Sequence, residues 1–158
     1  MWQRIQTLFL IVVVISLVGS IFLPIWHFTE PSGKRHVLYA LHYMTREAGA
    51  PPEAQVSVYL PYSITAMFAV AAATVAFISI GKYKNRYTQM KLGAFNSLLL
   101  AGTLASSVYF VTQLSKTLQG GATSLGLWLP GAAVLCNLLA NRFIRRDERI
   151  VKDSDRLR

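Results

Sequence analysis

Four long, uncharged, apolar runs constrain this chain more than any motif in it. They cover residues 8–26, 58–80, 92–114 and 125–143, except that Arg142 lies at the exit of the last run and is counted with the C-terminal tail. About 20 such residues span the hydrocarbon core of a bilayer, and a backbone in lipid satisfies its hydrogen bonds best as a helix. Residues 11–17 of the first run and 66–80 of the second lack the polar stripe of a soluble amphipathic helix,. We therefore predict an all-α membrane protein with four transmembrane helices.

The distribution of charge predicts how these helices are oriented. The N-terminus, the segment between the second and third runs and the C-terminal tail hold 12 of the Lys and Arg residues, and the other two connections hold 4. Basic residues favour the cytoplasmic side, so we expect an antiparallel up-down bundle with both termini inside. This divides the chain into a transmembrane domain over 1–144 and a charged cytoplasmic tail over 145–158. Anionic lipid of the inner leaflet then accounts for the basic excess without nucleic acid.

The long outer segment between the first two runs needs structure of its own. Its Glu30-Pro31-Ser32-Gly33 sequence is typical of a turn,, and the flanks 26–29 and 36–39 are able to pair across it as a hairpin. Alternatively, residues 34–48 form a short helix that Gly49 and the following prolines end. The sequence leaves both alternatives open, and either structure would cap the outer face of the bundle.

Small residues recur every fourth position on two of the runs, a spacing that lets helix backbones approach closely in lipid. The pattern does not say whether this packing is internal or with a partner. The candidate packing residues are Ala69 and Ala73 on the second run and Gly93, Ser97, Ala101 and Ala105 on the third.

Reactive groups are scarce in the apolar runs. Their interiors contain no Asp, Glu or His, which argues against an ion-coupled carrier. The lone Cys136 excludes a dithiol oxidoreductase. Five polar residues on the third and fourth runs form either interhelical hydrogen bonds or a polar path; they are Asn96, Thr103, Ser107, Asn137 and Asn141.

All three histidines, His27, His36 and His42, lie in the outer segment. Their spacing, with Glu30 and Glu47 nearby, matches no metal-binding motif. No nucleophile motif or phosphate-binding loop is present either. We therefore expect no catalytic, metal or cofactor site.

The tail is the most patterned polar segment. Glu148 precedes Lys152 by four residues, an orientation that stabilises a helix,. We expect the fourth run to continue as a charged helix, which is either a solvated helix end near anionic lipid or a docking helix for a partner. The candidate docking residues are Arg145, Arg146, Glu148, Arg149, Lys152, Asp155, Arg156 and Arg158.

Three segments carry a family resemblance: the opening Met1-Trp2-Gln3-Arg4-Ile5-Gln6-Thr7, the Leu92-Gly93-Ala94-Phe95-Asn96 start of the third run, and the ending 144–158. Together they resemble a family of small four-span inner-membrane proteins of Gram-negative bacteria, domain of unknown function 4293. The resemblance implies this topology and a bacterial inner membrane, and it transfers no site residues.

These observations lead to a functional hypothesis. The chain is expected to act without catalysis, as an accessory or scaffold subunit of a larger inner-membrane complex such as respiratory or protein-export machinery. Anionic lipids and other membrane subunits are the expected partners. The alternative is a small-molecule or lipid carrier or channel that uses the Asn/Ser/Thr face, and a third class is a quinone- or haem-binding redox subunit.

Overall fold

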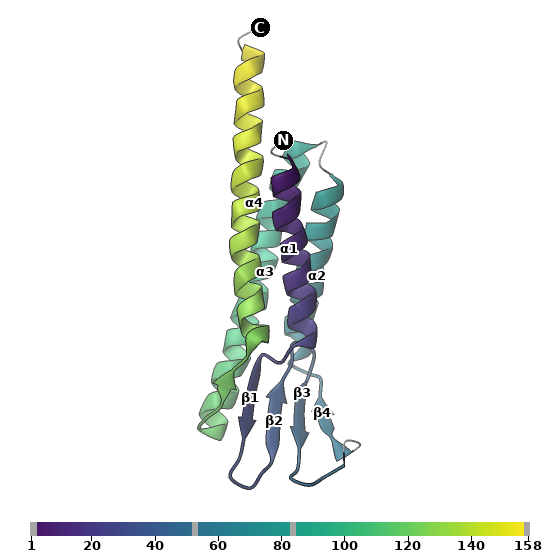
Figure 1. Cartoon of the computed structure of the whole chain (residues 1–158), viewed down its shortest axis with the longest axis vertical. Helices are drawn as coiled ribbons and strands as arrows, with labels where there is room; N and C mark the ends of the chain where they lie inside the picture. Colours follow the sequence, from purple (N-terminus) through teal and green to yellow (C-terminus); the bar gives the residue numbers. More distant parts are fainter. Residues whose placement is uncertain (1–2, 52–53, 83–84, 157–158) are drawn as a thin grey trace.

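The computed structural model shows a four-helix bundle with a small β-sheet at one end (Figure 1). It describes residues 3–51, 54–82 and 85–156, without the side chains of residues 3, 4, 86 and 151–156. The helices are α1 (Gln3–Phe22), α2 (Ser63–Gly81), α3 (Arg86–Leu118) and α4 (Leu125–Arg156). Within the described residues, these 4 helices are long and apolar enough to cross a membrane.

The helices are arranged as a ring in which each contacts its two sequence neighbours and α4 closes the ring against α1. Successive helices run in opposite directions, so α1 begins and α4 ends at the end of the bundle that faces away from the sheet (Figure 1). The four predicted helices are therefore present. At the end of the bundle that faces away from the sheet, α2 ends and α3 begins (Figure 1).

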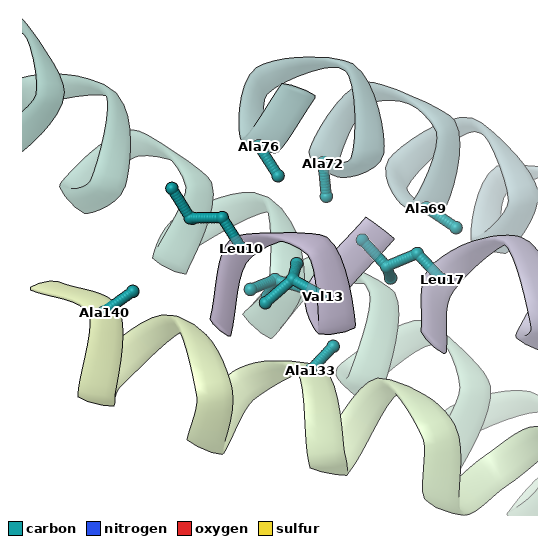
Figure 2. Close-up of a cluster of buried hydrophobic side chains, with 9 residues drawn as sticks. Leu10, Val13, Leu17, Ala69, Ala72, Ala76, Ala133 and Ala140 are labelled. Atoms are coloured by element: carbon teal, nitrogen blue, oxygen red, sulfur yellow. The ribbon is translucent and has the colours of Figure 1, made fainter. Parts of the chain in front are cut away.

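The centre of the bundle combines large side chains of α1 with alanines of its neighbours. Leu10, Val13 and Leu17 are buried against the alanine faces of α2 and α4 (Figure 2). Because lipid is as apolar as leucine, the contact is stabilised by close packing more than by removal of surface from water. The alanines that receive these side chains are Ala69, Ala72, Ala76, Ala133 and Ala140.

The prediction of an all-α protein is wrong, because five strands form an antiparallel sheet in the order β4-β3-β2-β1-β5. Four of them come from the segment between α1 and α2, and the fifth precedes α4. The strands are β1 (Trp26–Thr29), β2 (Arg35–Leu38), β3 (Tyr43–Arg46), β4 (Val56–Val58) and β5 (Ala122–Thr123).

Of the two alternatives for the outer segment, the hairpin is confirmed and the helix over 34–48 is wrong. β1 pairs with β2 in a register that joins Trp26 to Leu38 and Thr29 to Arg35. The segment 34–48 contains β2 and β3 instead of a helix. The physical reason is visible in β2, where His36 and Leu38 are buried and Arg35 is exposed, a two-residue alternation that suits a strand,.

The sheet is fixed to the bundle by a second apolar cluster. Trp26 and Leu38 of the sheet are buried against Phe110 and Leu114 near the end of α3. Gly121, at a positive φ of 106°, lets the chain turn from α3 into β5, and a Cβ there would overlap the Trp26 ring. The sheet is therefore continuous with the hydrophobic core of the protein.

Candidate functional site

A cluster of amides joins α3 to α4 inside the bundle. Asn96 Nδ2 donates to Asn137 Oδ1 at 3.0 Å, and Asn137 Nδ2 donates to Ser97 Oγ at 2.8 Å. The Gly93 carbonyl accepts from Asn137 Nδ2 at 3.3 Å and from Asn141 Nδ2 at 3.1 Å. Interhelical hydrogen bonds of this kind hold membrane helices together. The cluster thus fixes the α3–α4 contact.

Gly93 permits this arrangement because it has no side chain. A Cβ at this position would overlap the Asn141 amide. The buried oxygens Asn96 Oδ1 and Asn141 Oδ1 have no hydrogen-bond partner among the described residues. The amide cluster is therefore tightly packed and does not tolerate added volume at Gly93.

The predicted packing residues fall into two groups. Gly93 and Ser97 lie in the α3–α4 contact, Ala69 is fully buried, and Ala73 packs against the bundle core. Ala101 and Ala105 are exposed. A four-residue spacing drifts around a helix of 3.6 residues per turn, so the buried stripe of α3 follows a three-four spacing instead, through Asn96, Leu100, Thr103, Ser107 and Phe110.

The hydroxyls on this stripe bond to their own helix. Thr103 Oγ1 donates to the Leu99 carbonyl at 3.0 Å, and Ser107 Oγ donates to the Thr103 carbonyl at 2.8 Å. Both residues are buried. Their hydrogen-bonding groups are therefore already engaged within α3.

Next to the amide cluster, toward the end where α4 projects, an arginine-lined groove of about 670 Å³ opens between α3 and α4. Arg145, Arg146 and Arg149 of the predicted docking set line it together with Arg142. The other lining residues are Ala94, Ser97, Leu138 and Asn141. Ser97 and Asn141 were named from the sequence for helix contacts, and Ala94 and Leu138 were missed. The four arginines lie at i, i+3, i+4 and i+7, so their common face was readable from the sequence, but the α3 wall was not.

The remaining docking candidates have different surroundings. Glu148 is half-buried on α4. The side chains of Lys152, Asp155 and Arg156 lie outside the described part of the structure, as does Arg158 altogether. The prediction that the fourth run continues as a helix agrees with α4, which runs without a break to Arg156.

Asp147 is a buried carboxylate that the sequence analysis treated as part of the tail. It is 8% exposed, and its Oδ2 accepts a hydrogen bond from Gln6 Nε2 of α1 at 2.7 Å. The signal was available, because Asp147 continues the three-four spacing of Asn137, Ala140 and Ile144 along the buried face of α4. Asp147 therefore extends the α1–α4 contact beyond the apolar core.

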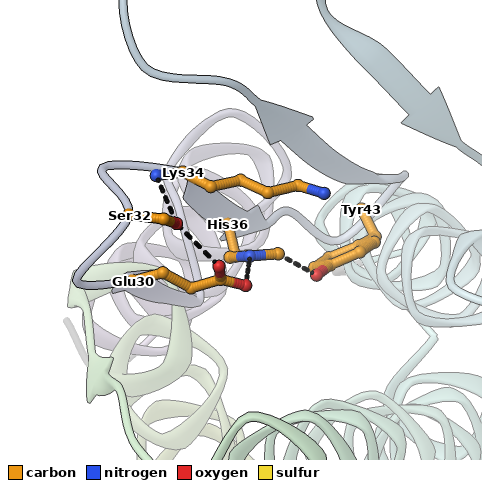
Figure 3. A network of polar contacts seen from close by, with 5 residues as sticks. All are labelled: Glu30, Ser32, Lys34, His36 and Tyr43. Atoms are coloured by element: carbon orange, nitrogen blue, oxygen red, sulfur yellow. Dashed lines mark hydrogen bonds and ion pairs between the residues drawn. The ribbon is translucent and has the colours of Figure 1, made fainter.

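A second polar network lies in the sheet and involves Glu30, Ser32, His36 and Tyr43 (Figure 3). His36 Nε2 is 2.8 Å from Glu30 Oε1, and His36 Nδ1 is 2.5 Å from the Tyr43 hydroxyl. A carboxylate only accepts hydrogen bonds, so Nε2 of a neutral His36 donates to Glu30 while Nδ1 accepts from Tyr43. Both ring nitrogens are thus used.

The electrostatics of this network follow from its bonds. Hydrogen bonds from Ser32 and then from His36 hold the pKa of Glu30 below its ordinary value of 4.5. Burial raises the pKa of Tyr43 to about 12, with smaller contributions from Tyr62 and Glu30. At neutral pH, Glu30 is therefore an acceptor and Tyr43 a donor, as the geometry requires.

The three histidines occupy separate environments. His27 Nδ1 lies 2.8 Å from Ser124 Oγ, and the His42 ring stacks on Tyr39 with centroids 5.0 Å apart. Within the described residues, no three His, Cys, Asp or Glu side chains are grouped to hold a metal ion. The sheet network therefore has the form of a hydrogen-bonded structural element.

Comparison with known proteins gives one positive result. No curated protein matches the sequence. The family described as domain of unknown function (DUF4293) matches residues 2–157, nearly the whole chain. This confirms the resemblance drawn from the sequence, and the four apolar helices agree with a small multi-pass membrane protein. The chain therefore belongs to the DUF4293 family.

Proposed function

We propose that the protein is a non-catalytic accessory or scaffold subunit of a larger complex in a bacterial inner membrane, with both termini in the cytoplasm. The orientation is supported by the charge pattern, since 12 basic residues belong to the segments at the end where α1 begins and α4 ends, and 4 belong to the sheet end,. The sheet then lies on the outer face.

The observation that carries this proposal is the length of α4. This helix has 32 residues, and its C-terminal part rises well beyond the other three helices (Figure 1). An isolated helix is marginally stable in water without packing, and in the sequence the extension carries opposite charges at four-residue spacing, such as Glu148 and Lys152,. Such an extension suits docking against another protein, and we assign this role to the part beyond Arg149.

The interior of the bundle supports a structural role over the carrier alternative. The amides of Asn96 and Asn137 bond to each other, and Thr103 and Ser107 bond to their own helix. A conducting path needs polar groups that water or a substrate can reach. These side chains are buried and engaged, which favours interhelical adhesion.

The test is purification of the full chain, tagged at its N-terminus and expressed at native level, after mild extraction in a lipid-preserving polymer. We expect it to co-purify with other membrane subunits in a fixed stoichiometry measured by mass spectrometry. A matched variant carries residues 150–158 in shuffled order, which keeps composition and net charge. It should lose the partner while remaining in the membrane.

Two results would count against the proposal. One is recovery of the unmodified chain alone, as a single monodisperse species, under these conditions. The other is retention of the same partner by the shuffled variant, which would move the docking surface away from the α4 extension.

A further inference from the structure

One face of α4 changes from leucine to arginine at the arginine-lined groove. Leu135 and Leu138 are 64% and 53% exposed, and Arg142, Arg145 and Arg149 follow on the same face at three- and four-residue spacing. The α3 side of the groove is formed by Ala94 and Ser97. Going along α4 away from the sheet, this surface is apolar at the leucines and then cationic at the arginines. The acyl chains and headgroup of a lipid follow the same order.

The groove also lacks a negative charge of its own. Its described lining residues include four arginines and no carboxylate. Arg142, Arg145 and Arg149 follow one another at three- and four-residue spacing, and like charges at this spacing on a helix repel one another. An anion in the groove would therefore relieve repulsion among these three residues as well as gain contacts. The planar guanidinium matches phosphate oxygens in a bidentate geometry. The groove is thus suited to a phosphate group.

We propose that this groove binds an anionic glycerophospholipid, with its phosphate among Arg142, Arg145 and Arg149 and its acyl chains along Leu138 and Leu135. Basic pockets between membrane helices are typical sites for such headgroups. The exposed leucines continuing from the arginines favour a lipid over a free phosphate or an acidic peptide, neither of which needs an apolar wall. This inference goes beyond the accessory role and does not depend on it.

The test measures binding of phosphatidylglycerol and phosphatidylcholine to the purified full chain in detergent by native mass spectrometry. The variant Arg142→Gln/Arg145→Gln removes two charges from exposed groove residues. The control Lys82→Gln/Lys91→Gln removes two charges from exposed residues at the same end but outside the groove. We expect the groove variant to lose about thirtyfold in affinity for phosphatidylglycerol and the control less than threefold.

A variant with unchanged net charge distinguishes lipid binding in the groove from general attraction of the lipid to surface charge. Ala94 is exposed and lines the groove, so Ala94→Trp should fill the cavity and weaken phosphatidylglycerol binding while net charge stays the same. Equal losses in the groove variant and the lysine control would overturn the proposal, as would unchanged binding by Ala94→Trp.

Competition identifies the source of the anion. Inorganic phosphate and a glutamate-rich peptide are added at concentrations equal to that of the lipid. We expect neither to displace phosphatidylglycerol. Displacement by inorganic phosphate would make this a free-phosphate site, and displacement by the peptide would make it a protein-docking site; either result contradicts the lipid assignment.

Discussion

At the sheet end, Glu30, His36 and Tyr43 bond to one another, whereas at the opposite end four arginines line an open groove without a carboxylate in its described lining. The two regions use polar side chains in opposite ways. A polar group that is paired within the chain stabilises the fold, and burial makes its loss costly. Charges left facing a groove cost little to remove but retain binding capacity. Pairing is therefore a guide to which charged residues hold the fold together and which, like Arg142, Arg145 and Arg149, face the groove.

The largest effect should come from His36, which is 5% exposed. His36→Ala leaves Tyr43 and Glu30 without their shared partner and opens a cavity, so we expect a loss of about 3 kcal/mol in the free energy of unfolding. Arg145→Ala, at the exposed groove, should change it by no more than about 0.5 kcal/mol. Thermal unfolding in detergent measures both. Comparable losses would mean that the arginines are structural, and the contrast between the two ends would fail.

A smaller effect is expected at Gly93, where the amide cluster adjoins the groove. In Gly93→Ala the added Cβ displaces the Asn141 amide from its bonds to α3, and the loss should be about 1–2 kcal/mol. Gly131→Ala on α4 is the matched control, because a Cβ there meets nothing within 4 Å. The control should be neutral or more stable by up to about 1 kcal/mol. Two equally stable variants would show that the amide cluster is loosely packed.

The sequence was sufficient for the helices because an uncharged apolar run has few alternatives in a membrane. It was less informative for the sheet, whose strands are short and adjoin the runs. Trp26 ends the first run and Val58 begins the second, yet they belong to β1 and β4. Hydropathy does not distinguish a buried strand residue from a span residue at such a junction.

The same limit applies to the sites. A face of arginines is readable from spacing along one helix, but Ala94 becomes part of the groove only through the packing of α3 against α4. Asp147 illustrates the converse: its sequence neighbours are charged, and its partner Gln6 is 141 positions away. Contacts between distant helices depend on the tertiary arrangement, which the periodicity of a single helix does not encode.

The hydrogen bond from Gln6 to Asp147 engages a carboxylate at the same end of the bundle as the arginine-lined groove. It therefore allows a paired charged group and the groove arginines to be compared at one end. A double-mutant cycle with Gln6→Ala and Asp147→Ala should give a coupling free energy of about 1–2 kcal/mol, because the hydrogen bond is buried and involves a carboxylate,. Thermal unfolding of the four proteins measures it. If the losses in the free energy of unfolding of the two single variants add up in the double variant, the hydrogen bond between Gln6 and Asp147 contributes no coupling free energy.

The smallest expected effect is the pH dependence contributed by Glu30. Its pKa is lower in the folded protein than its ordinary value of 4.5, through hydrogen bonds from Ser32 and then His36. The unfolded chain therefore binds a proton at higher pH than the folded chain does, and the stabilisation is fully present above the ordinary value and is lost as the pH falls through the folded pKa.

Glu30→Gln should remove this component, so the melting temperature of the variant should fall less steeply than that of the unmodified protein when the pH is lowered from 6 to 3. Glu47→Gln makes the same chemical change at an exposed residue just beyond β3 and should leave the slope as it is in the unmodified protein. If Glu30→Gln also leaves the dependence of the melting temperature on pH unchanged, the ionised form of Glu30 does not stabilise the sheet. The pairing at that end would then rest on His36 and Tyr43 alone.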